Sequence, residues 1–159
     1  MIWIKKDTDG SIYNWIKSSL KDQDEFHNSL TIGIYFYKKL IAGIVFSIYS
    51  KYNVYLTIYT EDKNWCCRRV INFVYEYCFN VLDSKKITCI ADKSNRKIRK
   101  LLTKLGFRLE GVVKYGRLNG RPAFVFGLCY DDKARYKLFK NGDKLWAEAV
   151  KHQNNQNLI

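Results

Sequence analysis

Proline is almost absent from this sequence: Pro122 is the only one in 159 residues, whereas hydrophobic residues make up 47% and aromatic residues 16%. A disordered chain or a linker shows the opposite balance, because it lacks the apolar side chains that offset the entropy cost of folding. We therefore expect one folded domain over residues 1–150, a length that suits a single hydrophobic core. The polar segment 151–159 is expected to fray.

Long apolar runs and cysteine motifs are also missing. No stretch reaches the roughly 18 consecutive apolar residues of a membrane-spanning helix, and residues 1–5 do not form a signal peptide, so we predict a cytoplasmic protein without a membrane partner. The five cysteines are odd in number and lack Cys-x-x-Cys spacing, which predicts neither a disulfide framework nor a metal site. Cys78 and Cys89 are interpreted as small buried hydrophobic residues.

The spacing of apolar residues in the first half predicts one helix and three strands. A helix with one apolar face is expected over Ile12–Leu20, after the capping residues 9–11. Three runs rich in Ile, Val, Tyr and Phe then predict an antiparallel meander, because their lengths suit strands and short polar turns separate them. These runs cover Leu30–Tyr37, Leu40–Tyr49 and Val54–Tyr59.

The second half alternates between helix and strand. A helix is expected over Val70–Val81, a short strand over Lys86–Ala91, and another helix over Ile98–Leu105. A strand, a helix and a strand in this order predict a parallel strand pair joined by a right-handed crossover.

A hairpin and a last helix complete the expected elements. Phe107–Leu118 and Ala123–Tyr130 are expected to pair around the turn Asn119-Gly120, since Asn-Gly is a strong signal for a short turn. A helix is expected over Asp132–Val150.

One segment indicates a family as well as a helix. Asn95 precedes the helix, Gly106 and Phe107 close it, and Glu110 and Gly111 follow. This pattern resembles the GNAT superfamily of N-acetyltransferases, and the trailing Glu-Gly is typical of the branch that contains the ribosomal-protein alanine N-acetyltransferases. An ordinary amphipathic helix with a glycine cap explains Gly106 but not Asn95 or the Glu-Gly pair.

The resemblance extends from Ile12 to about Tyr136 and implies an α/β (α+β) GNAT fold. Such a fold has a mixed, mostly antiparallel central sheet, one splayed parallel strand pair, and helices on both faces. Acyl-CoA lies in the gap between the fourth and fifth strands, here Val54–Thr60 and Lys86–Ala91. The resemblance therefore implies acetyl-CoA as cosubstrate, an amine as acceptor and no metal. The residues it places against acyl-CoA are Thr57, Ile58, Tyr59, Asn64, Trp65, Cys66, Cys67, Arg68, Arg69, Asn95 and Arg99.

The loop after the fourth strand departs from the family pattern. Members usually carry glycines there, so that backbone N–H groups meet the pyrophosphate, but residues 62–67 contain none. A narrower resemblance is to mostly phage-encoded GNAT-like proteins with Trp-x-x-Arg at this loop, matched by Trp65 and Arg68. Arg68 and Arg69 would then supply the positive charge, because guanidinium groups bind phosphate in bidentate fashion. For Trp65, ligand contact and simple packing are equally good interpretations.

The resemblance also implies the reaction, in which a substrate amine attacks the acetyl thioester. The protein must position two reactants, accept one proton and protonate the leaving thiolate. Glu61 is the first candidate for the general base, and a solvated loop carboxylate is the alternative. Thr103 is the only candidate proton donor near the position where many members have tyrosine. Glu110 and Tyr115 are assigned to the acceptor side, and Glu110 has the alternative role of anchoring the hairpin.

The chain is strongly basic, with 28 Lys and Arg against 15 Asp and Glu and a formal net charge of +13. Such a charge attracts polyanions, although an AT-rich coding sequence produces the same composition without a functional reason. An N-acetyltransferase and a catalytically inactive GNAT-fold protein that binds nucleic acid or a host complex therefore both stay open, with a structural virion component as a third class. The binding protein would use Lys97, Arg99, Lys100 and Lys104.

Overall fold

The structure, a computed structural model, describes residues 1–20, 26 and 28–131. The helix expected over 132–150 and the polar tail 151–159 lie outside these residues. The strands are β1 Ile2–Lys6, β2 Ser29–Phe36, β3 Lys39–Ser50, β4 Asn53–Thr60, β5 Lys86–Asp92, β6 Arg108–Val113 and β7 Ala123–Cys129. The helices are α1 Ser11–Ser19, the short 3₁₀ helix η1 Lys63–Trp65, α2 Arg68–Glu76, its π-helical continuation η2 Tyr77–Val81, and α3 Arg96–Lys104.

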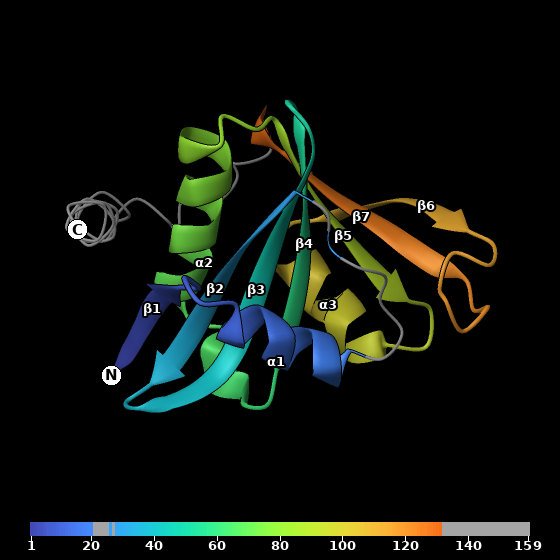
Figure 1. Ribbon diagram of the computed structural model, residues 1–159. Coiled ribbons are helices and arrows are strands. Elements are labelled where there is room, and N and C mark those ends of the chain that lie inside the picture. The colour runs from blue at the N-terminus through green and yellow to red at the C-terminus, as the bar shows by residue number, and fades with distance from the viewer. Residues whose placement is uncertain (21–25, 27, 132–159) are drawn as a thin grey trace.

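The strands form one sheet in the order β1-β2-β3-β4-β5-β7-β6 (Figure 1). Only β4 and β5 are parallel, and every other neighbouring pair in this sheet is antiparallel. Helix α1 lies in front of the sheet and α3 behind it (Figure 1). The mixed sheet with one parallel pair confirms the predicted fold class. No described helix is long and apolar enough to cross a membrane.

Helix α1 packs on the sheet over two glycines. Gly33 of β2 and Gly43 of β3 lie directly opposite each other in the strand register. A Cβ atom at Gly43 would lie 2.5 Å from Cδ1 of Ile16, and one at Gly33 would lie 2.8 Å from Cδ1 of Ile12. Both isoleucines are buried, with 0% and 3% of their surface exposed. The missing side chains therefore allow the helix its close approach.

Replacing Gly43 with alanine is expected to lower the free energy of unfolding by about 1–3 kcal/mol, because the new methyl group overpacks the contact with Ile16. Gly111→Ala is the matched control, since Gly111 also lies in a strand and a Cβ atom there would have no neighbour within 4 Å. Urea unfolding of both variants measures the difference. Equal stability of the two would show that α1 does not pack tightly on β3.

The main core lies on the other face of the sheet, under α2, η2 and α3. Phe46 of β3 is fully buried there, together with Val70 of α2 and Leu102 of α3, which are 0% and 3% exposed. Cys78 and Cys89 are buried in the same cluster, which confirms their interpretation as small hydrophobic residues. Burial raises the pKa of Cys89 to about 12, so its thiol stays protonated.

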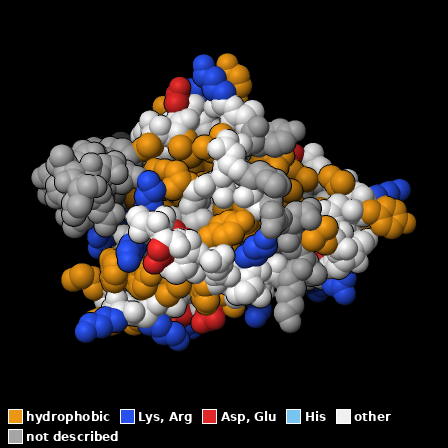
Figure 2. Space-filling view, in the orientation of Figure 1, with side chains coloured by type: hydrophobic (Ala, Val, Ile, Leu, Met, Phe, Trp, Pro, Cys, Tyr) orange, Lys and Arg blue, Asp and Glu red, His pale blue; other side chains and the backbone are white. Residues whose placement is uncertain are grey.

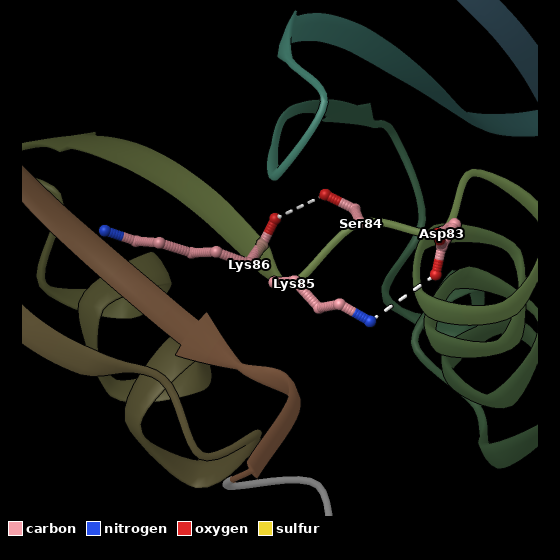
Figure 3. Close-up of polar contacts among 4 residues, drawn as sticks. All are labelled: Asp83, Ser84, Lys85 and Lys86. Carbon is pink, nitrogen blue, oxygen red and sulfur yellow. Dashed lines mark hydrogen bonds and ion pairs between the residues drawn. The ribbon is translucent and has the colours of Figure 1, made fainter.

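The turn from η2 into β5 determines where the parallel pair begins (Figure 3). Asp83 has a left-handed φ of 48°, and the fully buried Ser84 donates a hydrogen bond of 3.2 Å from Oγ to the carbonyl of Lys86. The N–H of Lys85 donates to the carbonyl of Tyr52 at 3.0 Å, just before β4. These bonds hold the first residues of β5 beside the first residues of β4.

One strand was missed, and the expected length of another was wrong. Residues 2–6 form the edge strand β1, which has no counterpart among the predicted elements. The expected hairpin strand Phe107–Leu118 ends instead at Val113, which pairs with Ala123. The connection is thus the loop 114–122. The predicted turn Asn119-Gly120 lies inside this loop, where Gly120 has φ 77°. The sheet pairing ends at a turn, in which the N–H of Gly116 donates to the carbonyl of Val113 at 3.2 Å and Tyr115 has a left-handed φ of 55°. Residues 115–118 beyond it line a cavity in the fold.

Candidate functional site

Strands β4 and β5 run together at one end and then separate (Figure 1). They pair at three positions: Asn53 with Lys86, Val54 with Ile87, and Tyr55 with Thr88. At the paired end, Oγ1 of Thr88 donates a hydrogen bond of 2.8 Å to Oδ1 of Asn53. Beyond Tyr55, β4 stays paired with β3 up to Thr60. On its other side, the segment 56–60 has no strand beside it among the described residues.

A cavity of about 630 Å³ occupies the gap between the separated strands. Its volume is in the range of small-molecule sites, roughly 300–1,000 Å³. Its walls come from the sheet, from α3 and from the end of α1. The lining comprises residues 55–58 of β4, residues 88–92 of β5, Asn95, Ile98 and Leu102 of α3, residues 115–118, and Leu20, Phe26 and Ser47.

The cavity brings together four of the predicted site residues: Thr57, Ile58, Asn95 and Tyr115. Tyr115 is 84% exposed and has a left-handed φ of 55°. The other predicted site residues lie outside the described cavity lining: Tyr59, Glu61, Asn64, Trp65, Cys66, Cys67, Arg68, Arg69, Arg99, Thr103 and Glu110.

Both ends of α3 are capped, by Asn95 at the start and, as the sequence predicts, by Gly106 at the end. Oδ1 of Asn95 accepts a hydrogen bond of 3.2 Å from the N–H of Ile98. At the other end, Gly106 has φ 92°, and the N–H of Phe107 donates to the carbonyl of Leu102 at 3.0 Å. Helix capping therefore accounts for Asn95 as well as Gly106, so an ordinary capped helix explains more of this segment than expected.

Asp92 is the carboxylate that sequence reasoning missed. It is the only Asp or Glu among the described residues that line the cavity. Its Oδ1 accepts bonds from the N–H and the Oγ of Ser94 at 2.8 and 2.7 Å, and its Oδ2 accepts one from Nδ2 of Asn119 at 3.3 Å. The bonds from Ser94 are the main cause that lowers the pKa of Asp92 to about 2. An Asp-x-Ser sequence directly after a buried strand is the signal that would have found it.

This network also holds the loop 114–122 at the mouth of the cavity. Asn119 belongs to that loop, and Nη1 of Arg121 donates to Oγ of Ser94 at 3.2 Å. Arg117 of the same loop lines the cavity. The described lining therefore carries one carboxylate, Asp92, and one guanidinium.

The loop before α2 closes without glycine because none of its residues needs a left-handed backbone. Oδ1 of Asp62 accepts a hydrogen bond of 2.9 Å from the N–H of Asn64, which starts η1. Trp65 is 4% exposed and belongs to the main core, which favours packing over ligand contact for this residue. Among the described non-glycine residues with positive φ, none lies between positions 61 and 67.

The remaining polar groups of this loop lie near the start of α2. Cys66 and Cys67 are half-buried, and burial raises the pKa of the Cys66 thiol, which makes it a poor nucleophile. Arg68 is exposed and Arg69 is half-buried in the first turn of the helix. Positive charge is therefore present where the resemblance implies a pyrophosphate site.

Thr103 and Arg99 lie on the side of α3 that faces the β6–β7 hairpin. Oγ1 of Thr103 donates a hydrogen bond of 3.0 Å to the carbonyl of Arg99. The guanidinium of Arg99 lies 4.6 Å above the ring of Phe124 and donates from Nη1 to the carbonyl of Lys93 at 2.6 Å. Both side chains therefore have structural partners away from the cavity.

Glu110 links the hairpin to β5. It lies at an irregularity in the pairing of β6 with β7, and its carboxylate forms an ion pair with Lys86 of β5. A Cβ atom at Gly127 of β7 would lie 2.3 Å from Oε1 of Glu110, so glycine leaves room for the carboxylate. The structure thus favours the anchoring role of Glu110.

No protein-family model and no curated protein sequence matches the chain. Solved structures do match it. A spermidine/spermine N-acetyltransferase from Vibrio cholerae superimposes with a TM-score of 0.70 over 86% of this chain and 99% of that one, at 15% identity. This chain has the GNAT fold. The ribosomal-protein alanine acetyltransferase from Vibrio fischeri matches with a TM-score of 0.57, at 19% identity, over 66% of this chain and 63% of that one.

A dodecameric spermidine N-acetyltransferase from Vibrio cholerae shares the GNAT fold at a TM-score of 0.67 and 14% identity, covering 80% of this chain and 93% of its own. At such identities the likeness establishes the fold alone, since one fold serves many functions.

Proposed function

We propose that the cavity binds acetyl-CoA together with an amine, and that this protein is an N-acetyltransferase. The separation of β4 from β5 beyond Tyr55 and Thr88 carries the proposal, because it opens a cavity of about 630 Å³ inside the sheet. Backbone N–H and C=O groups along residues 56–60 of β4 would pair with the amides of the pantetheine arm, since backbone polar groups need partners. Arg68 and Arg69 would attract the phosphates.

The reaction forms a bond from the amine nitrogen to the acetyl carbonyl carbon and breaks the carbon–sulfur bond. One proton leaves the amine, and the thiolate takes up one proton. Tyr55, Thr57 and Asn95 supply polar groups for positioning, which accounts for much of such catalysis. Asp92, with a pKa of about 2, is too weak a base near neutral pH but provides a fixed negative charge for a cationic amine.

Glu61 stays the proposed general base, acting through water. It directly follows the open edge of β4, and the hydroxyl of Tyr59 donates to its Oε1 at 3.5 Å. Its exposed position suits a proton acceptor that exchanges with solvent.

The acceptor is proposed to be an amine on an uncharged or acidic molecule. A formal net charge of +13 repels a polycation before it reaches the cavity, which disfavours a free polyamine. A cytoplasmic location would give the protein access to acetyl-CoA.

Thiol release from acetyl-CoA tests the proposal, with a peptide carrying an N-terminal alanine and spermidine as acceptors. The wild type is expected to release thiol, and faster with the peptide. Glu61→Gln is expected to lower turnover by roughly 10²–10⁴-fold, because a positioned base contributes about that factor. Asp83→Asn is the control, as Asp83 is an exposed carboxylate in the turn before β5.

Unchanged turnover in Glu61→Gln would remove Glu61 from the mechanism. If the protein binds acetyl-CoA but releases no thiol from it with either amine, the result would favour the second candidate, a catalytically inactive GNAT-fold binding protein. The position of Glu61 and Thr103 outside the described cavity lining is the observation in its favour.

A further inference from the structure

The outer face of α3 carries several cations, and the helix itself contains no carboxylate. Seven of the sixteen residues from Lys93 to Arg108 are Lys or Arg, and none is Asp or Glu. Four of them, Arg96, Lys97, Lys100 and Lys104, are exposed residues of α3 and are called the α3 cation row here. Arg96, Lys100 and Lys104 follow one another at four-residue intervals, so each step rises by about 6 Å along the helix.

The fold does not neutralise this row. Among the described residues, no ion pair or side-chain hydrogen bond involves its four members. The nearest carboxylates in the sequence have other partners: Asp92 accepts bonds from Ser94 and Asn119, and Glu110 pairs with Lys86. Like charges at four-residue spacing destabilise a helix, so a face that needed only to be soluble would be more stable with an acidic residue in the row.

Two open depressions extend the positive surface beyond the helix. One, of about 510 Å³, lies between α3 and the hairpin and is lined by Lys100 and Lys104 together with the apolar side chains of Leu109, Phe124 and Phe126. The other, of about 430 Å³, is lined by Lys93 and Arg121 and by one carboxylate, Asp92. Arg96 lines both. On the α1 face, Lys and Arg side chains are scattered singly among hydrophobic and polar residues (Figure 2). The α3 cation row belongs to the helix that lies behind the sheet in Figure 1.

We propose that the α3 cation row binds the phosphodiester backbone of a nucleic acid, at a surface separate from the cavity. Regularly spaced cations match the repeating charge of such a backbone. Lysine contacts to phosphate position a strand without reading bases, so binding is independent of sequence. A membrane surface fits less well, because α3 itself has no large exposed apolar side chain and only Leu109, 51% exposed, borders the depression beside Lys100 and Lys104.

The test compares two double variants with the same change in net charge. Lys100→Glu with Lys104→Glu alters the row. Lys38→Glu with Lys39→Glu, the far-side variant, alters two exposed lysines where β2 connects to β3, away from α3 (Figure 1). Fluorescence anisotropy measures their affinity for a 20-nucleotide single-stranded RNA and a DNA duplex at several salt concentrations. The row variant is expected to lose more than about tenfold in affinity, and its salt dependence on the single strand to become shallower by about 1.4, or 0.7 for each lost phosphate contact.

The far-side variant is expected to stay within about threefold of the wild type. Equal losses in the two variants, or no binding by the wild type, would overturn the proposal. Tighter binding to polyglutamate than to either nucleic acid would overturn it in favour of an acidic protein partner. Displacement of the RNA by saturating acetyl-CoA would show that the row is not separate from the cavity, and would overturn the proposal as stated.

The melting temperature, measured together with RNA affinity, separates a binding role of the row from a purely structural one. Lys100→Glu alone places a carboxylate one turn from both Arg96 and Lys104, so its melting temperature is expected to equal or exceed that of the wild type while RNA affinity falls. A lower melting temperature together with unchanged RNA affinity would assign the row a purely structural role. RNA binding is measured without any acceptor or thiol release, so failure of the acetyltransferase proposal leaves this test intact.

Discussion

Replacing Thr57 with tryptophan is expected to weaken acetyl-CoA binding by roughly 100-fold or more, about 2.7 kcal/mol, in isothermal titration calorimetry. Thr57 lies on β4 just beyond its last pair with β5, and it lines the cavity. An indole at this position would fill much of the space between the separated strands. It would also cover the open edge of β4, where an amide-containing ligand is proposed to pair.

Val112→Trp serves as the control for this experiment, because Val112 is a strand residue that is 52% exposed and lies outside the described cavity lining. Its affinity for acetyl-CoA is expected to equal that of the wild type. Equal binding by both tryptophan variants would place the ligand elsewhere on the protein. Absence of heat from the wild type up to millimolar acetyl-CoA would refute the enzyme proposal itself.

Replacing Trp65 with alanine is expected to lower the free energy of unfolding by about 3–5 kcal/mol, the usual cost of deleting a buried tryptophan side chain. Trp65 is 4% exposed in the main core, at the point where the chain passes from β4 into α2. Because a domain of this size is stabilised by only about 5–15 kcal/mol, the loss is large. Urea unfolding followed by circular dichroism measures it.

Trp3→Ala is the matched comparison, since Trp3 is 38% exposed at the sheet edge and loses less buried area on truncation. A similar loss in both variants would contradict the assignment of Trp65 to the core. Trp65→Phe, which keeps an aromatic ring, is expected to bind acetyl-CoA with unchanged affinity. A marked loss of affinity in that folded variant would restore ligand contact as the role of Trp65.

Sequence patterns predicted the elements well wherever local interactions decide the structure. Apolar periodicity located α2 and α3, and Asn95 and Gly106 marked the two ends of α3 correctly. Short or irregular segments were harder to predict from the sequence, because their conformation depends on residues far away in the chain. Strand β1 pairs with β2, whose residues lie about 30 positions further along the chain, and β6 stops at Val113 because a turn with a left-handed Tyr115 follows.

The candidate site was predicted only in part. Thr57, Ile58, Asn95 and Tyr115 do line the cavity, whereas Glu61 and Thr103 do not. The family pattern places residues along the chain, but the direction of a side chain depends on which face of its element is packed. Thr103 shows this, since its hydroxyl bonds to the turn of α3 before it, on the side that faces the hairpin.

The sequence by itself determined the order of helices and strands from α1 to β7, the glycine that ends α3, the absence of glycine before α2, and the run of seven Lys and Arg without Asp or Glu from Lys93 to Arg108. These are local properties, set by periodicity, capping and composition. Only the tertiary structure decided where β4 and β5 separate, that Trp65 is buried, and that Asp92 faces a cavity. Each of these depends on contacts between residues far apart in the chain, which no local pattern records.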